Sequence, residues 1–127
     1  LKEDYLVNFV AHEQVPFWIS MGDASVFFIR PSFSKKSSCP TKFAESLSSG
    51  LPVVINSGIG DTDKFVNKHN IGIVINEFSE QEYVRSVNKL YKEAGSLKIN
   101  CREAVMQNLS LEKGVDKYFK IYWRLLN

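Results

Sequence analysis

The chain has 127 residues, of which 44% are hydrophobic and 24% charged, a length and composition typical of one soluble globular domain. We therefore expect residues 1–127 to form a single domain. Sixteen basic and fourteen acidic residues leave a formal net charge of +2, a balance that gives no reason to expect binding to nucleic acid or to an anionic membrane. No apolar run approaches the roughly 20 residues that span a bilayer, so no membrane segment is expected.

The two cysteines, Cys39 and Cys101, lie far apart and match no metal-binding spacing. No signal peptide is recognisable, so we expect reduced thiols in a cytoplasmic protein. We expect neither a metal ion nor a bound cofactor.

The first part of the chain alternates apolar runs with helical patterns. The apolar runs predict strands over residues 6–10, 25–29, 51–56 and 71–75. Helices are predicted between them over residues 15–21, 40–49 and 62–68, with Pro16 in the first turn of the first and Gly50 ending the second. The run at 25–29 is apolar without alternation, which is typical of a parallel strand covered on both faces. Strands that alternate with helices predict the α/β class, with a Rossmann-like parallel sheet of about four strands and flanking helices.

Three further helices are expected to close the chain. Ser79 and Glu82 form a capping box for the first, which should end near Gly95. The second should cover residues 97–108, and the third should begin at Ser110. The apolar residues of that third helix recur at helical spacing and predict core packing rather than a ligand site: Val115, Tyr118, Phe119, Tyr122 and Trp123.

Open parallel sheets bind ligands beyond the carboxyl ends of their strands, where helix N-termini converge. Residues 30–39 and 57–61 occupy that position. The first loop is rich in serine and lysine and leads into a helix whose N-terminus attracts anions. Neither a GxGxxG nor a GxxxxGK[ST] motif is present, so the signal for phosphate binding is weaker than a phosphate loop would give.

Glu45 lies one turn after Thr41, on the side of the helix opposite Phe43 and Leu47. A carboxylate there repels a phosphate placed directly on it, but it can accept two hydrogen bonds from a sugar diol beside that phosphate. We therefore predict a nucleotide, with its diphosphate at the helix start and its ribose on Glu45. The simpler interpretation remains open, because serine and threonine are common helix caps and a glutamate near a helix start favours the dipole.

The stretch DASVFFIRPSFSKKSSCPTKFAESLSSGLPVVINSGIGDTDKFV resembles the nucleotide-sugar-binding half of retaining GT-B glycosyltransferases of group 1 (family 4). Pro31-Ser32, Glu45 and the segment GLPVV at 50–54 occur in the order of that family. The segments VAHEQVPFWISMGDA, NIGIVI and LSLEKGVDKYFKIYWRLL are similar to the family's flanking segments, so the resemblance covers essentially the whole chain.

The resemblance implies roles for matching residues. Glu45 matches the glutamate that holds the ribose hydroxyls, and Pro40 and Thr41 fall where the helix meets the diphosphate. Ser37 stands where the family has the glutamate that contacts the transferred sugar, a departure that puts sugar choice and turnover in question. Lys42 belongs to a Ser-x-Pro-Thr-Lys version that resembles a subtype in polysaccharide assembly. The nucleotide-sugar-binding candidates are Lys36, Ser37, Ser38, Pro40, Thr41, Lys42 and Glu45, and no catalytic residue or metal ligand is assigned.

The resemblance also implies an activity for the full-length protein: transfer of a sugar from a nucleotide-sugar donor to a glycan or lipid-linked acceptor with retention of configuration. The family's C-terminal domain starts about two strands earlier, with cation-bearing Gly-Arg and Lys-Gly segments that are not found here. We therefore expect the last part of a larger enzyme, inactive alone and partnered by an N-terminal acceptor-binding domain. That domain would place the enzyme at the periphery of the inner membrane.

The truncated sheet should leave an unpaired edge on the strand at 25–29. We expect either that the strand at 6–10 closes onto this edge or that the chain self-associates there. His12, at the start of a loop, is better explained as a turn or cap residue than as a ligand contact, and Cys39 as a small residue lining the site.

Three other functions remain open. The first is a GT-B-fold sugar-nucleotide epimerase, and the second is a non-catalytic α/β interaction domain of the flavodoxin or receiver type. Receiver domains need acidic residues at their strand ends, whereas Arg30, Pro31, Asn56 and Asn76 stand there. The third is a degenerate, non-catalytic GT-B partner, which Ser37 keeps open.

Overall fold

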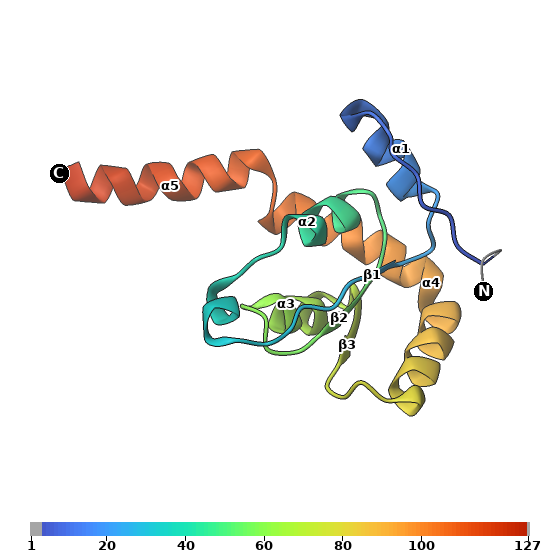
Figure 1. Cartoon of the computed structure of the whole chain (residues 1–127). Helices are drawn as coiled ribbons and strands as arrows, with labels where there is room; N and C mark the ends of the chain where they lie inside the picture. The colour runs from blue at the N-terminus through green and yellow to red at the C-terminus, as the bar shows by residue number, and fades with distance from the viewer. Residues whose placement is uncertain (1–3, 127) are drawn as a thin grey trace.

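A computed structural model describes residues 4–126 (Figure 1). It contains a parallel sheet in the order β1-β2-β3, in which β1 covers Ser25–Val26, β2 Val53–Asn56 and β3 Gly72–Ile75. The α-helices are α1 (Val15–Ser20), α2 (Thr41–Ser48), α3 (Thr62–His69), α4 (Glu80–Asn108) and α5 (Leu111–Leu126). Two short 3-10 helices are η1 (His12–Gln14) and η2 (Phe33–Ser37). The predicted α/β class, with helices flanking a parallel sheet, is confirmed.

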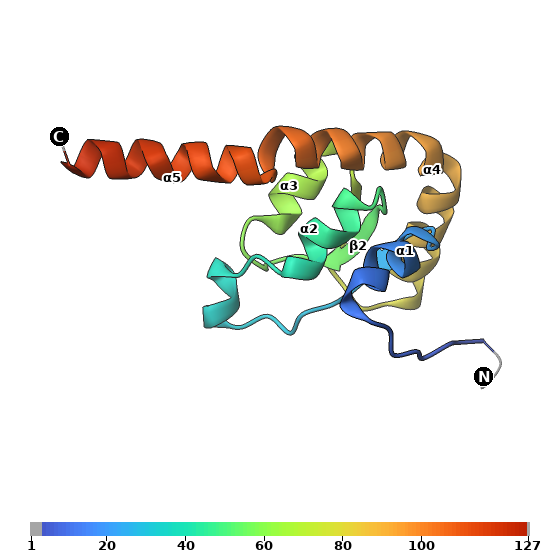
Figure 2. The same cartoon turned by 90° about the horizontal axis from the view of Figure 1, so that it is seen from above.

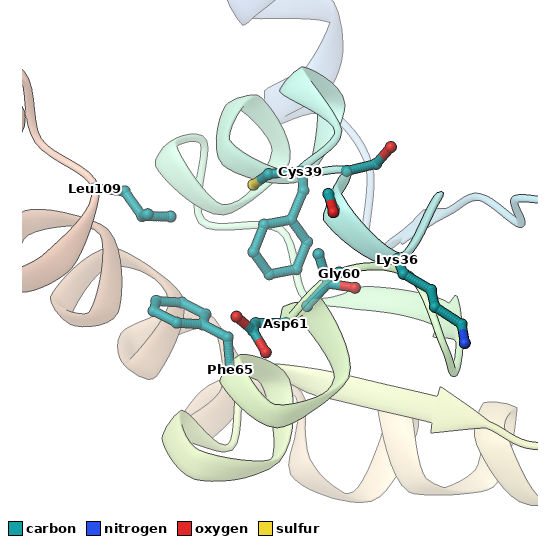
Figure 3. A pocket seen from close by; sticks show the side chains of 10 residues that line it. Lys36, Cys39, Gly60, Asp61, Phe65 and Leu109 are labelled. Carbon is teal, nitrogen blue, oxygen red and sulfur yellow. The ribbon is translucent and has the colours of Figure 1, made fainter. Parts of the chain in front are cut away.

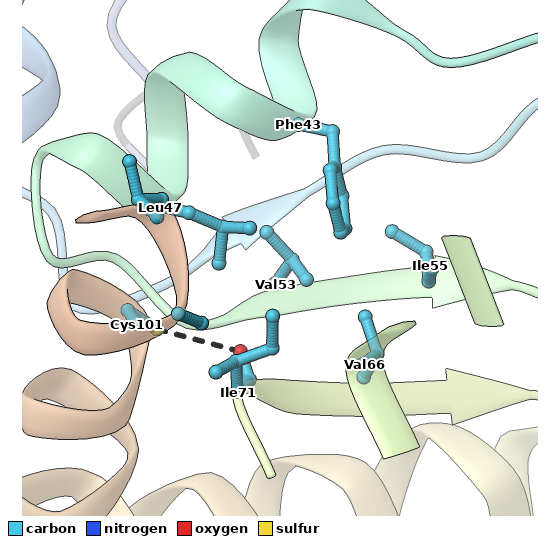
Figure 4. Close-up of a cluster of buried hydrophobic side chains, with 9 residues drawn as sticks. Phe43, Leu47, Val53, Ile55, Val66, Ile71 and Cys101 are labelled. Atoms are coloured by element: carbon cyan, nitrogen blue, oxygen red, sulfur yellow. Dashed lines mark hydrogen bonds between the residues drawn. The ribbon is translucent and has the colours of Figure 1, made fainter. Parts of the chain in front are cut away.

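The centre of the fold is β2, all four residues of which are buried. On one face of the sheet, Val53 and Ile55 pack against α2, α3 and the second half of α4 (Figure 4). On the other face, Val54 packs with residues of β3 against Leu90 of α4. Cover on both faces explains why the apolar run of β2 shows no alternation with polar residues.

Helix α2 begins and ends close to where the sequence predicts. Pro40 precedes its first residue, and Gly50 follows its end with φ +75°, a backbone conformation that glycine adopts without strain. Its inward side carries Phe43 and Leu47, both of which are buried in the core (Figure 4). This packing fixes the outward side of α2, which carries Glu45.

The predicted strand over residues 6–10 is wrong. This segment is not part of the sheet, and Phe9 is 96% exposed. It does not close onto β1, which is only two residues long and pairs with β2 alone in the described part of the chain. An apolar run becomes a strand only where a neighbouring strand supplies hydrogen bonds, and here none lies alongside residues 6–10.

The predicted break near Gly95 is also wrong, because α4 runs without interruption through 29 residues. A glycine inside a helix costs about 1 kcal/mol relative to alanine. Leu97 and Cys101, both fully buried after the glycine, supply packing that exceeds this cost. Of the predicted capping box, the Ser79 half is confirmed, since the Glu82 amide donates to Ser79 Oγ at 3.4 Å, whereas the Glu82 carboxylate accepts from Arg85 at 2.7 Å.

The core packing predicted for the last helix is wrong as well. In both views α5 extends away from the sheet and its covering helices (Figures 1 and 2), and none of its residues is buried. The predicted stripe is 58–66% exposed: Val115, Tyr118, Phe119, Tyr122 and Trp123. Helical periodicity shows that one face of a helix is apolar, but it does not show which element packs against that face. Within the described residues, no element covers this face of α5.

We expect Leu47→Ala to lower the free energy of unfolding by about 2–5 kcal/mol, because the side chain is fully buried and its removal leaves a cavity. Urea unfolding followed by circular dichroism measures this loss. Leu6→Ala is the matched control: Leu6 is exposed, so the change should stay within about 0.5 kcal/mol. Equal effects of the two substitutions would show that α2 is not packed as described.

Candidate functional site

The loops that follow β1 and β2 are joined at their start by Asn56, the last residue of β2. Its buried side chain accepts from the Ile29 amide at 2.8 Å and donates to the Ile29 carbonyl at 2.9 Å. It also donates to the Ser57 carbonyl at 3.1 Å. The amide group thus continues the pairing of the two strands beyond β1 and fixes where the loop at 30–39 begins.

A second contact between the loops involves Gly60, which has φ +53°. Its amide donates to the Lys35 carbonyl at 3.0 Å, and a Cβ atom added to it would overlap the carbonyl oxygen of Ser38. Only glycine allows this approach of backbone to backbone. The two loops predicted to form the site therefore do meet, and they meet through main-chain atoms.

We expect Asn56→Ala to lower the free energy of unfolding by about 1–3 kcal/mol, because it leaves the part-buried amide and carbonyl of Ile29 without their partner. Thermal or urea unfolding measures the change. Asn67→Ala, on the exposed side of α3, is the control and should leave stability at or above that of the unsubstituted chain, since alanine has the higher helix propensity. If Asn56→Ala left the free energy of unfolding unchanged, as the control does, the Asn56 side chain would have no structural role.

One hollow, which we call the η2 pocket, lies between the two loops (Figure 3). It has a volume of about 280 Å³. Its lining comes from the first loop (Lys36, Ser37, Ser38, Cys39), the second loop and α3 (Gly60, Asp61, Thr62, Phe65), α2 (Phe43) and Leu109. The rings of Phe43 and Phe65 meet edge to face at 5.9 Å. The pocket thus has an aromatic side and a rim of hydroxyl and charged groups.

The charges at the rim of the η2 pocket are partly engaged with other groups. The Lys36 ammonium points away from the aromatic side (Figure 3) and lies 5.9 Å from the centroid of the Phe33 ring. The Asp61 carboxylate accepts from Lys64 Nζ at 3.0 Å, and this bond raises the pKa of Lys64 above its ordinary value. Lys64 therefore stays protonated and offsets the negative charge that Asp61 would otherwise present to an anion.

A second hollow, the α1–α2 pocket, lies on another side of α2 and has a volume of about 490 Å³. Its lining comes from η1 and α1 (His12, Val15, Pro16, Ile19) and from α2 with its C-cap residue (Ala44, Glu45, Ser48, Ser49). Glu45 is exposed, and within the described residues its carboxylate has no hydrogen bond or ion pair. The hydroxyl groups of Ser48 and Ser49 are taken up by backbone carbonyls of α2, at 2.7 and 3.1 Å. Glu45 is consequently the free acceptor that α2 offers to this pocket.

The first turn of α2 separates the two groups of candidates. Lys36, Ser37 and Ser38 line the η2 pocket and Glu45 lines the α1–α2 pocket. Pro40 occupies the N-cap position of α2. No side chain there accepts a hydrogen bond from the first amide groups of the helix. The remaining candidates, Thr41 and Lys42, are exposed in this turn. The structure brings Lys36, Ser37 and Ser38 together and places Glu45 apart from them.

Sequence reasoning did not assign His12 to the site, although it lines the α1–α2 pocket together with Glu45. The position of α1 beside α2 depends on the tertiary arrangement of the chain, for which no local pattern gives a signal. Asp61 and Phe65 were missed in the same way. Asp61 lies in the second loop that the sequence predicts at the site, residues 57–61. The sequence therefore indicated its position, although no role was assigned to its side chain.

We expect the two cysteines to differ in reactivity. Cys39 is exposed at the η2 pocket. Cys101 is buried, its Sγ lies 3.5 Å from the Ile71 carbonyl (Figure 4), and burial raises the pKa of its thiol to about 12. A disulfide reagent at mildly alkaline pH should therefore modify one thiol quickly, because only thiolates react and Cys101 stays protonated until the pH approaches 12.

The absorbance of the aromatic thiol that the reagent releases on reaction measures the number of reactive cysteines. Cys39→Ser should abolish the fast phase, and denaturant should expose the second thiol. Two fast thiols in the native chain would contradict the burial of Cys101.

A family model described as the glucosyltransferase 3-like C-terminal domain matches residues 32–107. The chain belongs to this family. The matched part of this glycosyltransferase C-terminal domain runs from the first site loop through most of α4, and it includes all seven candidate residues. No curated protein and no solved structure matches the chain. Among residues 4–126, no helix is long and apolar enough to span a bilayer.

Proposed function

We propose that this glycosyltransferase C-terminal domain holds the nucleotide-sugar donor across the first turn of α2, as in retaining GT-B enzymes of group 1 (family 4). The observation that carries the proposal is the unpaired Glu45 carboxylate in the α1–α2 pocket, one turn (about 5.4 Å) beyond the uncapped start of the helix. A ribose diol on Glu45 leaves the attached diphosphate at the amide groups of Thr41 and Lys42. Both the helix N-terminus and the Lys42 ammonium attract that anion.

In the proposal, the chemistry of the two pockets determines which end of the donor lies in which pocket. The α1–α2 pocket has apolar side chains from Val15, Pro16 and Ile19 beside Glu45, which suits a nucleobase attached to the ribose. The η2 pocket presents the hydroxyl groups of Ser37 and Ser38, which suit the transferred sugar. In this arrangement base, ribose, diphosphate and sugar follow one another across α2.

The reaction proposed for the full-length protein is transfer of a hexose from the nucleotide-sugar to a glycan or lipid-linked acceptor, with retention. Negative charge grows on the departing diphosphate in the transition state. In the proposal, the amide groups at the start of α2 and the Lys42 ammonium stabilise this charge more than they stabilise the bound donor. This stabilisation is the proposed contribution of the domain to the rate.

Several further features of the proposal concern the rest of the protein. We infer an N-terminal acceptor-binding domain that completes the cleft, a cytoplasmic location at the periphery of the inner membrane, and no transferase activity of the chain alone. The edge of β1, where Val26 is 61% exposed, is the proposed place for pairing with a further strand or with a second copy.

We expect Glu45→Gln to weaken binding of a ribonucleoside diphosphate by about tenfold or more, because hydrogen bonds to a charged acceptor contribute about 1.5–3 kcal/mol. Isothermal titration with the common nucleoside diphosphates measures this. Glu103→Gln, an exposed substitution on α4 with the same chemistry, is the matched control and should leave affinity unchanged.

The 2′-deoxy form of the tightest ligand tests the role of the diol directly. It should bind less well than the ribose form to the unsubstituted chain, and the difference should disappear in Glu45→Gln. Equal affinity for both sugars in the unsubstituted chain would contradict the proposed contact.

Ser37 favours a second candidate, a degenerate domain that binds the donor without turnover. A serine at the η2 pocket can hydrogen-bond a sugar but carries no charge. Both candidates predict the same nucleotide binding by this chain. Transfer of labelled sugar to an acceptor by the full-length protein separates them.

A further inference from the structure

The second site loop, residues 57–61, is fixed to the start of α3 before it meets the first loop. Ile59 is only 2% exposed, and its carbonyl accepts from the Thr62 hydroxyl at 2.6 Å and from the Thr62 amide at 3.2 Å. The Gly58 amide donates to Asp63 Oδ2 at 3.3 Å. The shape of this loop is therefore set by the core and by α3, and it does not require a ligand.

The first loop rests on this fixed loop at Gly60, which lies beside the segment that carries Lys36 (Figure 3). The Lys35 carbonyl accepts from the Ser38 amide at 3.2 Å, which closes the turn of η2, and from the Gly60 amide at 3.0 Å. The Ser38 carbonyl lies against the Cα atom of Gly60, where a Cβ atom would overlap it. Gly60 thus holds both ends of the turn from which the Lys36 and Ser37 side chains project.

The hydroxyl groups carried by this turn are available to a ligand. Among residues 4–126, neither the Ser37 nor the Ser38 hydroxyl has a hydrogen bond to the protein. The hydroxyl groups of Ser32 and Ser34, earlier in the same loop, are paired with each other at 3.1 Å. The two free hydroxyl groups at the η2 pocket are therefore those whose backbone Gly60 holds in place.

We propose that Gly60 is a positioning residue for the transferred sugar. By fixing the turn from Lys35 to Ser38, it sets where the Ser37 and Ser38 hydroxyl groups meet that sugar, and so determines how well the domain distinguishes a nucleotide-sugar from the bare nucleoside diphosphate. This inference rests on the proposed function, which places the sugar in the η2 pocket, and it deepens that function by naming the residue that sets the fit.

Two glycine substitutions separate displacement of the first loop from backbone strain. Gly58 and Gly60 both have positive φ, at +83° and +53°, so alanine is strained at either position. A Cβ atom at position 58 has no other atom within 4 Å. At position 60 the Ser38 carbonyl would have to move by about 1 Å to reach van der Waals distance from the new methyl group. Gly58→Ala is therefore the matched control for Gly60→Ala.

The test is isothermal titration of the chain with UDP, ADP and GDP and with their glucose conjugates. Gly60→Ala should lower the affinity for the tightest conjugate, relative to its diphosphate, by about tenfold, which corresponds to the loss of one or two hydrogen bonds. Affinity for the diphosphate should persist, because the packing of Phe43 and Leu47 holds α2 in place. Gly58→Ala should leave the ratio of the two affinities unchanged. A general loss of structure weakens both ligands alike, so this ratio isolates the positioning role.

A reading without ligand comes from Cys39, which follows Ser38 and is exposed. Gly60→Ala should change the rate at which a disulfide reagent modifies Cys39, whereas Gly58→Ala should not. If Gly60→Ala does not fold, Thr62→Val provides a second variant. It removes the hydroxyl bond to the Ile59 carbonyl, loosens the second loop and should lower the same affinity ratio by about threefold.

The outcomes distinguish this inference from the proposed function. Nucleotide binding with the same affinity ratio in Gly60→Ala as in the unsubstituted chain would overturn the inference and leave the proposed function standing. A ratio that falls equally in Gly58→Ala would assign the effect to backbone strain and would also overturn it. No binding of any of these nucleotides by the unsubstituted chain would overturn both.

Discussion

The buried side chain of Asn56 is the interaction on which the candidate site depends. It bonds both polar groups of the Ile29 backbone, and it stands at the end of β2, the strand that the core covers on both faces. The loop that carries Lys36, Ser37 and Ser38 starts at this point, and Gly60 holds the same loop from the other side. The rigid sheet therefore positions the first loop through main-chain groups, which leaves its side chains available for a ligand.

Much of the fold could be predicted because the core elements have strong local signals. The buried runs of β2 and β3, the stop at Gly50 and the cap at Ser79 act within a few residues of the chain. Predictions failed where the outcome depends on distant neighbours. Residues 6–10 lack a strand beside them, and burial of Leu97 and Cys101 outweighs the glycine in the middle of α4.

The candidate site was predictable to the level of its loops and its helix. Apolar spacing places Glu45 opposite Phe43 and Leu47, and the structure has the same arrangement. Spacing along one helix could not show that Glu45 and Ser37 line different pockets, because each pocket is completed by another element. The contribution of His12 depends on where α1 lies relative to α2, and that placement is a tertiary property.

The uneven distribution of charge along the chain has a consequence for its behaviour in solution. Because α5 carries the whole formal excess of positive charge, the remainder of the domain is electrically neutral. Proteins near their isoelectric point lose the mutual repulsion that keeps copies dispersed. The same helix exposes nine apolar or aromatic side chains, so proteolytic trimming after residue 110 would remove a source of repulsion and a source of apolar association together.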